Sequence, residues 1–257
     1  MKRRSYIVIA SVGAMILVTL SVVILGRKNN DEEMQNILQG RECLKSLEQL
    51  DVSEIEKKVN NNLKPEIVVD KDNINFYNFY ENTVFLGDSI TEGLAEMELI
   101  NEYNVISNKG DTVLKGRKNI DKIISMKPQN IVLLYGMNDV IEFDGGGPGG
   151  VEKFKEHYLG FISEIKEKLP NSNIYIQSPL PVLDSARKTN ERLTNENLNE
   201  FREVTKEVSE ESKTHYVDID ILVENSEELY EGDGIHFKYD FYLKWLTYLK
   251  QIIGENK

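Results

Sequence analysis

Ser89, in the sequence Gly87-Asp88-Ser89, has the surroundings of a nucleophile. The apolar run 83–86 precedes this triplet, and Ile90 opens a segment of helical character after it. This order predicts a strand, a tight turn and a helix, with the serine at the amino end of the helix. Backbone N–H groups and the helix dipole favour negative charge there. The hydroxyl could therefore attack a carbonyl group, and the oxyanion that forms would be held nearby.

The same serine has a simpler interpretation as a helix cap. Ser89 and Glu92 have the Ser-x-x-Glu spacing of a capping box, which any helix can use. Taken alone, this spacing favours a cap over a nucleophile. The decision depends on whether a base, an acid and oxyanion donors occur elsewhere in the chain.

A serine hydroxyl needs a base at neutral pH, and the chain offers three histidines. His157 falls within an amphipathic helical segment and is interpreted as a surface residue, while His215 opens a predicted strand and is interpreted as structural. His236 follows Asp233 by three residues in a loop. A carboxylate at that spacing can accept the imidazole Nδ1–H and stabilise the imidazolium, although a turn with a solvated histidine would have the same sequence.

The elements that must position these residues alternate along the chain. Short apolar segments predict strands at residues 83–86, 104–107, 130–135, 173–177 and 215–219. Helices are predicted at residues 112–126, 151–169 and 195–211, and Asp240 is predicted to cap a last helix. Continuous apolar strands between amphipathic helices indicate an α/β fold with a parallel sheet covered on both faces. Sites in such folds lie at the carboxyl ends of the strands.

Groups suited to acyl transfer follow the predicted strands. Gly110 comes after the second strand and could offer a backbone N–H, and Asn138 comes after the third and offers a side-chain amide. With the hydroxyl, imidazole and carboxylate already named, they complete the set that acyl transfer requires. Each also has an ordinary explanation, because Asn138 could cap a helix and Gly110 could supply a positive φ angle.

The order of these blocks resembles the SGNH/GDSL hydrolase family over about residues 83–253. The blocks are Gly87-Asp88-Ser89, Asn108 before Gly110, Gly136-Met137-Asn138-Asp139 and Asp233-Gly234-Ile235-His236. The resemblance implies a three-layer α/β/α sandwich with a flavodoxin-like parallel sheet. It also implies an esterase or acylhydrolase that needs neither a metal nor an organic cofactor.

The resemblance also implies a role for each site residue. Ser89 would be the nucleophile, His236 the base and Asp233 its orienting acid. The N–H groups of Ser89 and Gly110 and the side chain of Asn138 would form the oxyanion hole. Asp88 and Gly87 are then expected to shape the turn at the nucleophile.

Two loops depart from the family pattern or lie outside it. The second block, Asn108-Lys109-Gly110-Asp111, is tighter than the more usual Asn-x-Gly-x-x-Gly, which leaves its loop geometry open. The glycine-rich segment 144–150 is interpreted as a flexible connection, with a mobile lid as the alternative. It lacks the Lys-Ser/Thr ending of a phosphate-binding loop.

The amino terminus predicts a membrane anchor. Residues 6–25 are uncharged and almost wholly apolar, long enough to span a bilayer, and three basic residues precede them. We expect an uncleaved single-pass anchor in the cell membrane, with a cytoplasmic amino terminus and an extracytoplasmic catalytic domain. A cleaved signal peptide is the alternative, but the run does not end in an Ala-x-Ala-like site.

The chain is therefore predicted to have three parts: a basic end and anchor at 1–27, a helical stalk or linker at 28–80, and an SGNH hydrolase domain at 81–257. The stalk could pack on the domain, pair with another copy or hold the domain off the membrane.

Charge and location narrow the expected substrates. The formal net charge of −12 argues against nucleic acid as a partner. An acylated small molecule or glycan is expected, with O-acetyl esters on cell-envelope carbohydrate as the first choice. The alternatives are an O-acyltransferase acting on such a glycan, with a membrane acyltransferase as a partner, and a non-catalytic glycan-binding or scaffold protein.

Overall fold

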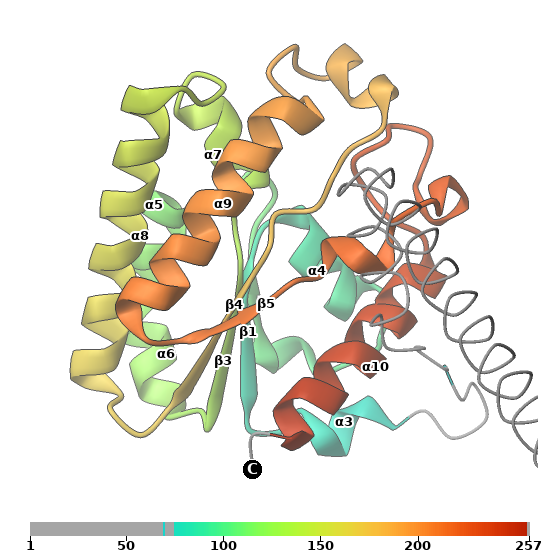
Figure 1. Cartoon of the computed structure of the whole chain (residues 1–257). Coiled ribbons are helices and arrows are strands. Elements are labelled where there is room, and N and C mark those ends of the chain that lie inside the picture. Colours follow the sequence, from blue (N-terminus) through green and yellow to red (C-terminus); the bar gives the residue numbers. More distant parts are fainter. Residues whose placement is uncertain (1–68, 70–74, 256–257) are drawn as a thin grey trace, which may run out of the picture. The chain divides into compact units, whose positions relative to one another are not determined.

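The computed structural model describes residue 69 and residues 75–255 (Figure 1). The predicted anchor and most of the predicted stalk lie outside the described residues. None of the helices within the described part is long and apolar enough to cross a membrane.

The described residues form one sheet of five parallel strands in the order β2-β1-β3-β4-β5. The strands are β1 (Thr83–Gly87), β2 (Val105–Ser107), β3 (Asn130–Leu134), β4 (Asn173–Gln177) and β5 (His215–Val217). The order confirms the flavodoxin-like sheet. The order in which the chain adds strands reverses between β1 and β3, while all strands stay parallel. In α/β sheets, ligands bind at the carboxyl ends of the strands beside such a reversal.

Helices cover both faces of the sheet and make three layers (Figure 1). One face carries α3 (Phe76–Phe79), α4 (Ser89–Glu96) and α10 (Tyr239–Glu255). The other carries α5 (Val113–Gly116), α6 (Ile120–Met126), α8 (Pro148–Lys168) and α9 (Asn195–Ser212), while α7 (Met137–Glu142) follows the carboxyl end of β3. Short 3₁₀ helices fill several connections: η1 (Glu102–Asn104), η2 (Arg117–Asn119), η3 (Asp184–Lys188), η4 (Asp220–Leu222) and η5 (Glu227–Leu229).

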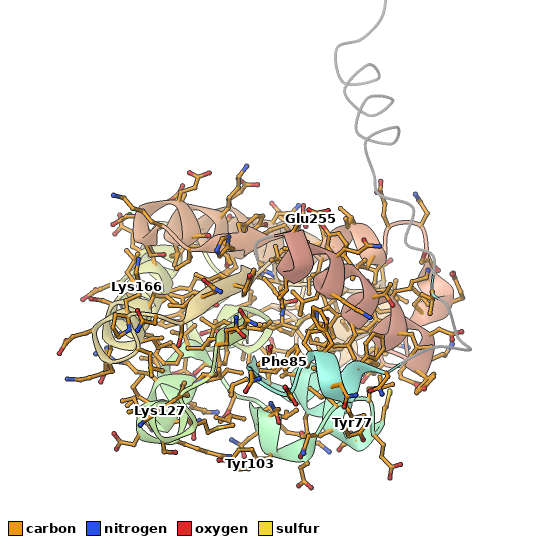
Figure 2. The ribbon with its side chains drawn as sticks, turned by 90° about the horizontal axis from the view of Figure 1, so that it is seen from below. Tyr77, Phe85, Tyr103, Lys127, Lys166 and Glu255 are labelled. Carbon is orange, nitrogen blue, oxygen red and sulfur yellow. The ribbon has the colours of Figure 1, made fainter. Side chains whose placement is uncertain are left out.

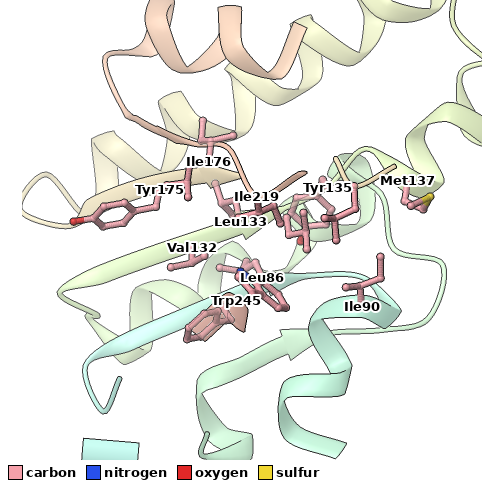
Figure 3. Packing of buried hydrophobic residues seen from close by; sticks show 14 of the residues in the cluster. Leu86, Ile90, Val132, Leu133, Tyr135, Met137, Tyr175, Ile176, Ile219 and Trp245 are labelled. Atoms are coloured by element: carbon pink, nitrogen blue, oxygen red, sulfur yellow. The ribbon is translucent and has the colours of Figure 1, made fainter. Parts of the chain in front are cut away.

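The burial of the inner strands explains why their positions could be predicted from the sequence. Every residue of β1 and β3 is buried, as expected for inner strands of a sheet covered on both faces. Leu86, Val132 and Trp245 belong to one continuous apolar cluster (Figure 3). Seen from below, Phe85 lies inside the molecule, whereas Tyr103 lies at its edge and is 64% exposed (Figure 2).

The segment just before β1 packs with this core. Phe76 and Tyr80 are buried, and the Tyr80 hydroxyl donates to the Leu246 carbonyl of α10 at 2.6 Å. Residues 76–80 are therefore part of the folded unit.

Several predicted boundaries differ from the structure. The predicted helix 112–126 is three pieces, α5, η2 and α6. The first piece, α5, ends at Gly116. A Cβ atom at this position would lie 2.1 Å from the Tyr135 hydroxyl, so only glycine fits there. Helix α8 begins at Pro148 rather than 151, because proline suits the first helical position. Helix α10 begins at Tyr239, so the prediction that Asp240 caps it is wrong.

Candidate active site

Ser89 is the first residue of α4, and one residue, Asp88, separates it from β1. The cap of this helix is Asp88, whose backbone is extended and whose Oδ1 accepts the Ile90 N–H at 3.0 Å. The capping-box interpretation of Ser89 with Glu92 is therefore wrong, because aspartate one residue earlier is itself a strong cap. The Ser89 hydroxyl is left available for another partner.

That partner is His236. Its Nε2 lies 2.9 Å from Ser89 Oγ, and its Nδ1 lies 2.6 Å from Asp233 Oδ2. The three side chains thus form one hydrogen-bonded line. The second carboxylate oxygen of Asp233 accepts the N–H groups of Ile235 and His236 at 2.9 and 3.0 Å.

These contacts set the charge of Asp233. Burial alone would raise the pKa of its carboxyl, but the hydrogen bonds from the His236 ring and from the backbone N–H groups of Ile235 and His236 outweigh it and hold the pKa below its ordinary value. The carboxylate is therefore charged near neutral pH. A charged carboxylate fixes the imidazole tautomer with its proton on Nδ1 and leaves Nε2 free to accept a proton.

The loop that carries Asp233 and His236 is a closed turn. The N–H of Glu231 donates to the His236 carbonyl at 2.8 Å, and Leu183 N–H donates to the Gly234 carbonyl at 2.9 Å. Gly234 has φ +73°, and a Cβ there would lie 2.3 Å from Ser185 Oγ. The connection between β4 and η3 thus supports the loop from outside the sheet.

The candidate oxyanion donors lie at the same end of the sheet. Ser89, Gly110, Asn138 and His236 line one cavity of about 540 Å³. Gly110 has φ +76°, in a tight turn closed by the bond from Asp111 N–H to the Asn108 carbonyl at 3.0 Å. The shortened second block is therefore a compact turn.

The rest of the cavity is mixed in character. Its apolar lining comes from Met97, Met137, Ile141, Leu193, Ile235 and Phe237, and its charged lining from Glu96, Lys109 and Glu231. Such a cavity can take a ligand with an apolar part and a polar part. No three His, Cys, Asp or Glu side chains in the described part of the chain converge as metal ligands.

Two buried aspartates tie the loops of this site together. Asp88 Oδ2 accepts the Asn138 side-chain amide at 2.8 Å. Asp139 Oδ1 accepts the Val113 N–H and its Oδ2 accepts the Gly136 N–H, both at 2.9 Å. Through these bonds the loop after β3 is joined to those after β1 and β2.

Burial shifts both of these carboxyl groups. Burial raises the pKa of Asp88 to about 6 against the lowering effects of the Ile90 N–H, His236 and Asn138. It raises the pKa of Asp139 to about 7 against hydrogen bonds from Val113 and Gly136. Sequence reasoning assigned no role to Asp139; the available signal was its position three residues after Gly136, the cap of α7.

The other two histidines lie elsewhere. His157 of α8 stacks on Phe143 with ring centroids 6.0 Å apart, and His215 of β5 stacks on Tyr175 at 4.8 Å. Neither lines the cavity at Ser89.

The glycine-rich segment is tied to its surroundings. Gly147 N–H donates to Glu200 Oε2 at 2.7 Å, and Arg192 pairs with Asp144 at 3.0 Å. No described residue of the segment lines the cavity at Ser89.

Comparison with known proteins agrees with this architecture. Among solved structures, a GDSL-like lipase from Bacteroides thetaiotaomicron is 19% identical with a TM-score of 0.55, over 71% of this chain and all of that chain. A lipase/acylhydrolase from Enterococcus faecalis is 21% identical with a TM-score of 0.53, over 68% of this chain and 96% of that one. These likenesses show a shared fold. No curated protein matches the chain. The model of the GDSL-like lipase/acylhydrolase family matches residues 85–242, and the chain belongs to that family.

Proposed function

We propose that this protein is a serine esterase that hydrolyses O-acyl esters, with Ser89, His236 and Asp233 as its catalytic triad. The observation that carries the proposal is the unbroken line of hydrogen bonds from Asp233 Oδ2 through both ring nitrogens of His236 to Ser89 Oγ. Nucleophile, base and orienting acid lie within hydrogen-bond reach of one another, as serine catalysis requires.

The reaction proceeds in two halves. Ser89 Oγ attacks the ester carbonyl carbon as its proton passes to His236 Nε2. The tetrahedral intermediate then breaks its bond to the alcohol oxygen, which takes the proton from His236, and an acyl-enzyme remains. Water attacks this acyl group while His236 takes a water proton, and the carboxylic acid leaves as the proton returns to Ser89.

Negative charge on the carbonyl oxygen is held by three donors. They are the Ser89 N–H at the start of α4, the Gly110 N–H and the Asn138 amide, all from residues that line the cavity. Hydrogen bonds that strengthen as the oxyanion forms lower the barrier without tightening the binding of the substrate.

The proposed substrates are O-acetyl esters on cell-envelope carbohydrate. The mixed lining supports this choice, because an apolar wall suits an acyl group and a charged rim suits a hydroxylated alcohol. The proposal also rests on the apolar segment 6–25 as an uncleaved anchor that places the catalytic domain outside the cell membrane. Cell fractionation tests the anchor, and recovery of the intact chain in the soluble fraction would contradict it.

An O-acyltransferase is the alternative, because a sugar hydroxyl could replace water in the second half of the reaction. The open cavity of about 540 Å³ exceeds the space that an acetyl group needs, which leaves room for an acceptor beside the acyl-enzyme. Incubation with an acetyl donor and a sugar distinguishes the two, since transfer gives acetylated sugar and hydrolysis gives free acetate alone.

The deciding experiment treats the purified full chain with a fluorophosphonate and locates the adduct by mass spectrometry. We expect a single adduct on Ser89, and loss of both labelling and aryl-ester hydrolysis in Ser89→Ala. Ser125→Ala is the matched control, because Ser125 is exposed and its hydroxyl donates to the Lys122 carbonyl of its own helix. An unlabelled Ser89 in a wild-type chain that hydrolyses no ester would favour a non-catalytic glycan-binding or scaffold protein. Full activity in Ser89→Ala would instead show that Ser89 is not the nucleophile.

A further inference from the structure

We infer that Asp88 is a positioning residue that orients the Asn138 amide toward the oxyanion. The inference rests on the proposed esterase function and adds a residue outside the triad and outside the three oxyanion donors. It assigns separate tasks to the two carboxylate oxygens of Asp88.

The first observation is how Asp88 divides its contacts. Oδ1 accepts the Ile90 N–H at 3.0 Å and so caps α4, the helix whose first residue is Ser89. Oδ2 accepts the Asn138 Nδ2 at 2.8 Å. One buried carboxylate therefore contacts two of the three elements that supply oxyanion donors.

The second observation is the geometry of the amide. An asparagine amide is planar and carries two N–H donors and one carbonyl oxygen. Because Asp88 Oδ2 accepts one N–H, the amide nitrogen of Asn138 must face it, and the second N–H is the one left for the cavity that Asn138 lines. Above the pKa of Asp88, which is about 6, its carboxylate accepts but does not donate, so the reversed amide, with its oxygen toward Asp88, is excluded there.

The third observation is the burial of Asp88, which is 2% exposed. Water does not compete for Oδ2, and a buried carboxylate that lost its donor would be left unsatisfied. The charged and titratable groups that act on Asp88 are His236, Asp111, Asp139, Tyr135 and Tyr242. Among them, His236 offers a competing explanation, because a negative Asp88 could act directly on the imidazolium.

Asp88→Asn separates these tasks. Asparagine is as good a helix cap as aspartate, so the bond to Ile90 can be kept. Its Nδ2 would face the Asn138 Nδ2, donor against donor, which favours rotation of Asn138 until its carbonyl oxygen faces residue 88. The oxyanion then loses one donor. Asp88→Ser is the second variant, since serine also caps a helix but cannot reach Asn138 in the same way.

A double-mutant cycle on the full chain tests the inference. We expect Asp88→Asn to lower kcat roughly 10- to 100-fold with little change in KM, because an oxyanion donor acts mainly in the transition state. Asn138→Ala should cost about 10²–10³-fold, and the double variant should be no slower than Asn138→Ala alone. Losses that multiply would overturn the inference and would favour a direct effect of Asp88 on His236. Asn75→Ala, which removes the exposed cap of α3, should leave kcat unchanged.

A readout without turnover separates this inference from the proposed function. In the wild-type chain, the Nδ2 proton of Asn138 that is bonded to the buried carboxylate should be shifted downfield and should exchange slowly with water. Asp88→Asn and Asp88→Ser should move that resonance upfield and speed its exchange, and unchanged Asn138 signals would overturn the inference. If the wild-type Ser89 resists the fluorophosphonate, the esterase proposal fails, while these signals still decide whether Asp88 orients Asn138.

Discussion

Ser89 Oγ and His236 Nε2 lie 2.9 Å apart although 147 positions separate them in the chain. The sheet brings them together, because Ser89 lies two residues after the end of the inner strand β1 and His236 stands in the loop before α10. The contact gives the proposed nucleophile a base.

Asn138→Ala should reduce kcat for a short-chain aryl ester by about 10²–10³-fold and leave KM nearly unchanged. The reason is that the variant loses an oxyanion donor but keeps the triad. Steady-state kinetics on the purified full chain measure both constants. Asn171→Ala is the control, because Asn171 is exposed in the turn between α8 and β4. A rise in KM with unchanged kcat would instead place Asn138 in ground-state binding.

Asp233→Asn should lower kcat by about 10⁴-fold, because an amide can donate to Nδ1 and so favours the tautomer with its proton on Nε2. The proton on Nε2 would prevent His236 from accepting the one on Ser89. Single-turnover acylation with an aryl ester isolates this step. Asp184→Asn, at an exposed residue of η3, should retain wild-type rates. Near-normal acylation in Asp233→Asn would mean that another group orients the ring.

Gly234→Ala should destabilise the fold by roughly 1–3 kcal/mol, because alanine is strained at a positive φ and its Cβ would collide with Ser185 Oγ. The displaced loop carries Asp233 and His236, so kcat should fall as well. Gly232→Ala is the matched control two residues away, where a Cβ meets no atom within 4 Å. Urea unfolding and kinetics on both variants check this, and equal behaviour of the two would contradict it.

The stability of the wild-type chain should depend on the ionisation of Asp88. Burial raises its pKa to about 6 from 3.8, so the folded state binds a proton more tightly than the unfolded chain. The stability from this group is fully present below the unfolded pKa and is lost as the pH rises through about 6. Asp88→Asn lacks this titration. Its free energy of unfolding relative to wild type should therefore increase by up to about 3 kcal/mol from about pH 4 to about pH 8.

Urea unfolding of both proteins across this range measures the difference. Asp184→Asn, at an exposed position, should follow the wild-type curve. Parallel curves for Asp88→Asn and wild type would show that Asp88 titrates normally in the folded state.

The sequence by itself determined the order of the strands along the chain and their parallel arrangement, and it predicted residues for the candidate site. β4 has the predicted bounds, and β1 and β3 were found within one residue, because strands buried on both faces must be continuously apolar. The strand ends were informative for a related reason. Polar groups that follow parallel strands gather at one edge of the sheet, so Ser89 and Asn138 could be grouped without knowing any distance.

Only the tertiary structure decided which polar groups of the site are hydrogen-bonded to one another. Gly116 has no room for a Cβ atom because of the hydroxyl of Tyr135, a residue that directly follows β3. Asp139 accepts the Val113 N–H from 26 positions away, and Asp88 accepts the Asn138 amide from 50 positions away. The local pattern of the sequence reflects helix and strand propensity and burial. A hydrogen bond between two loops depends instead on where the whole sheet places those loops. Asp88 could therefore be recognised in the sequence as a turn residue, but its bond to Asn138 became visible only in the folded chain.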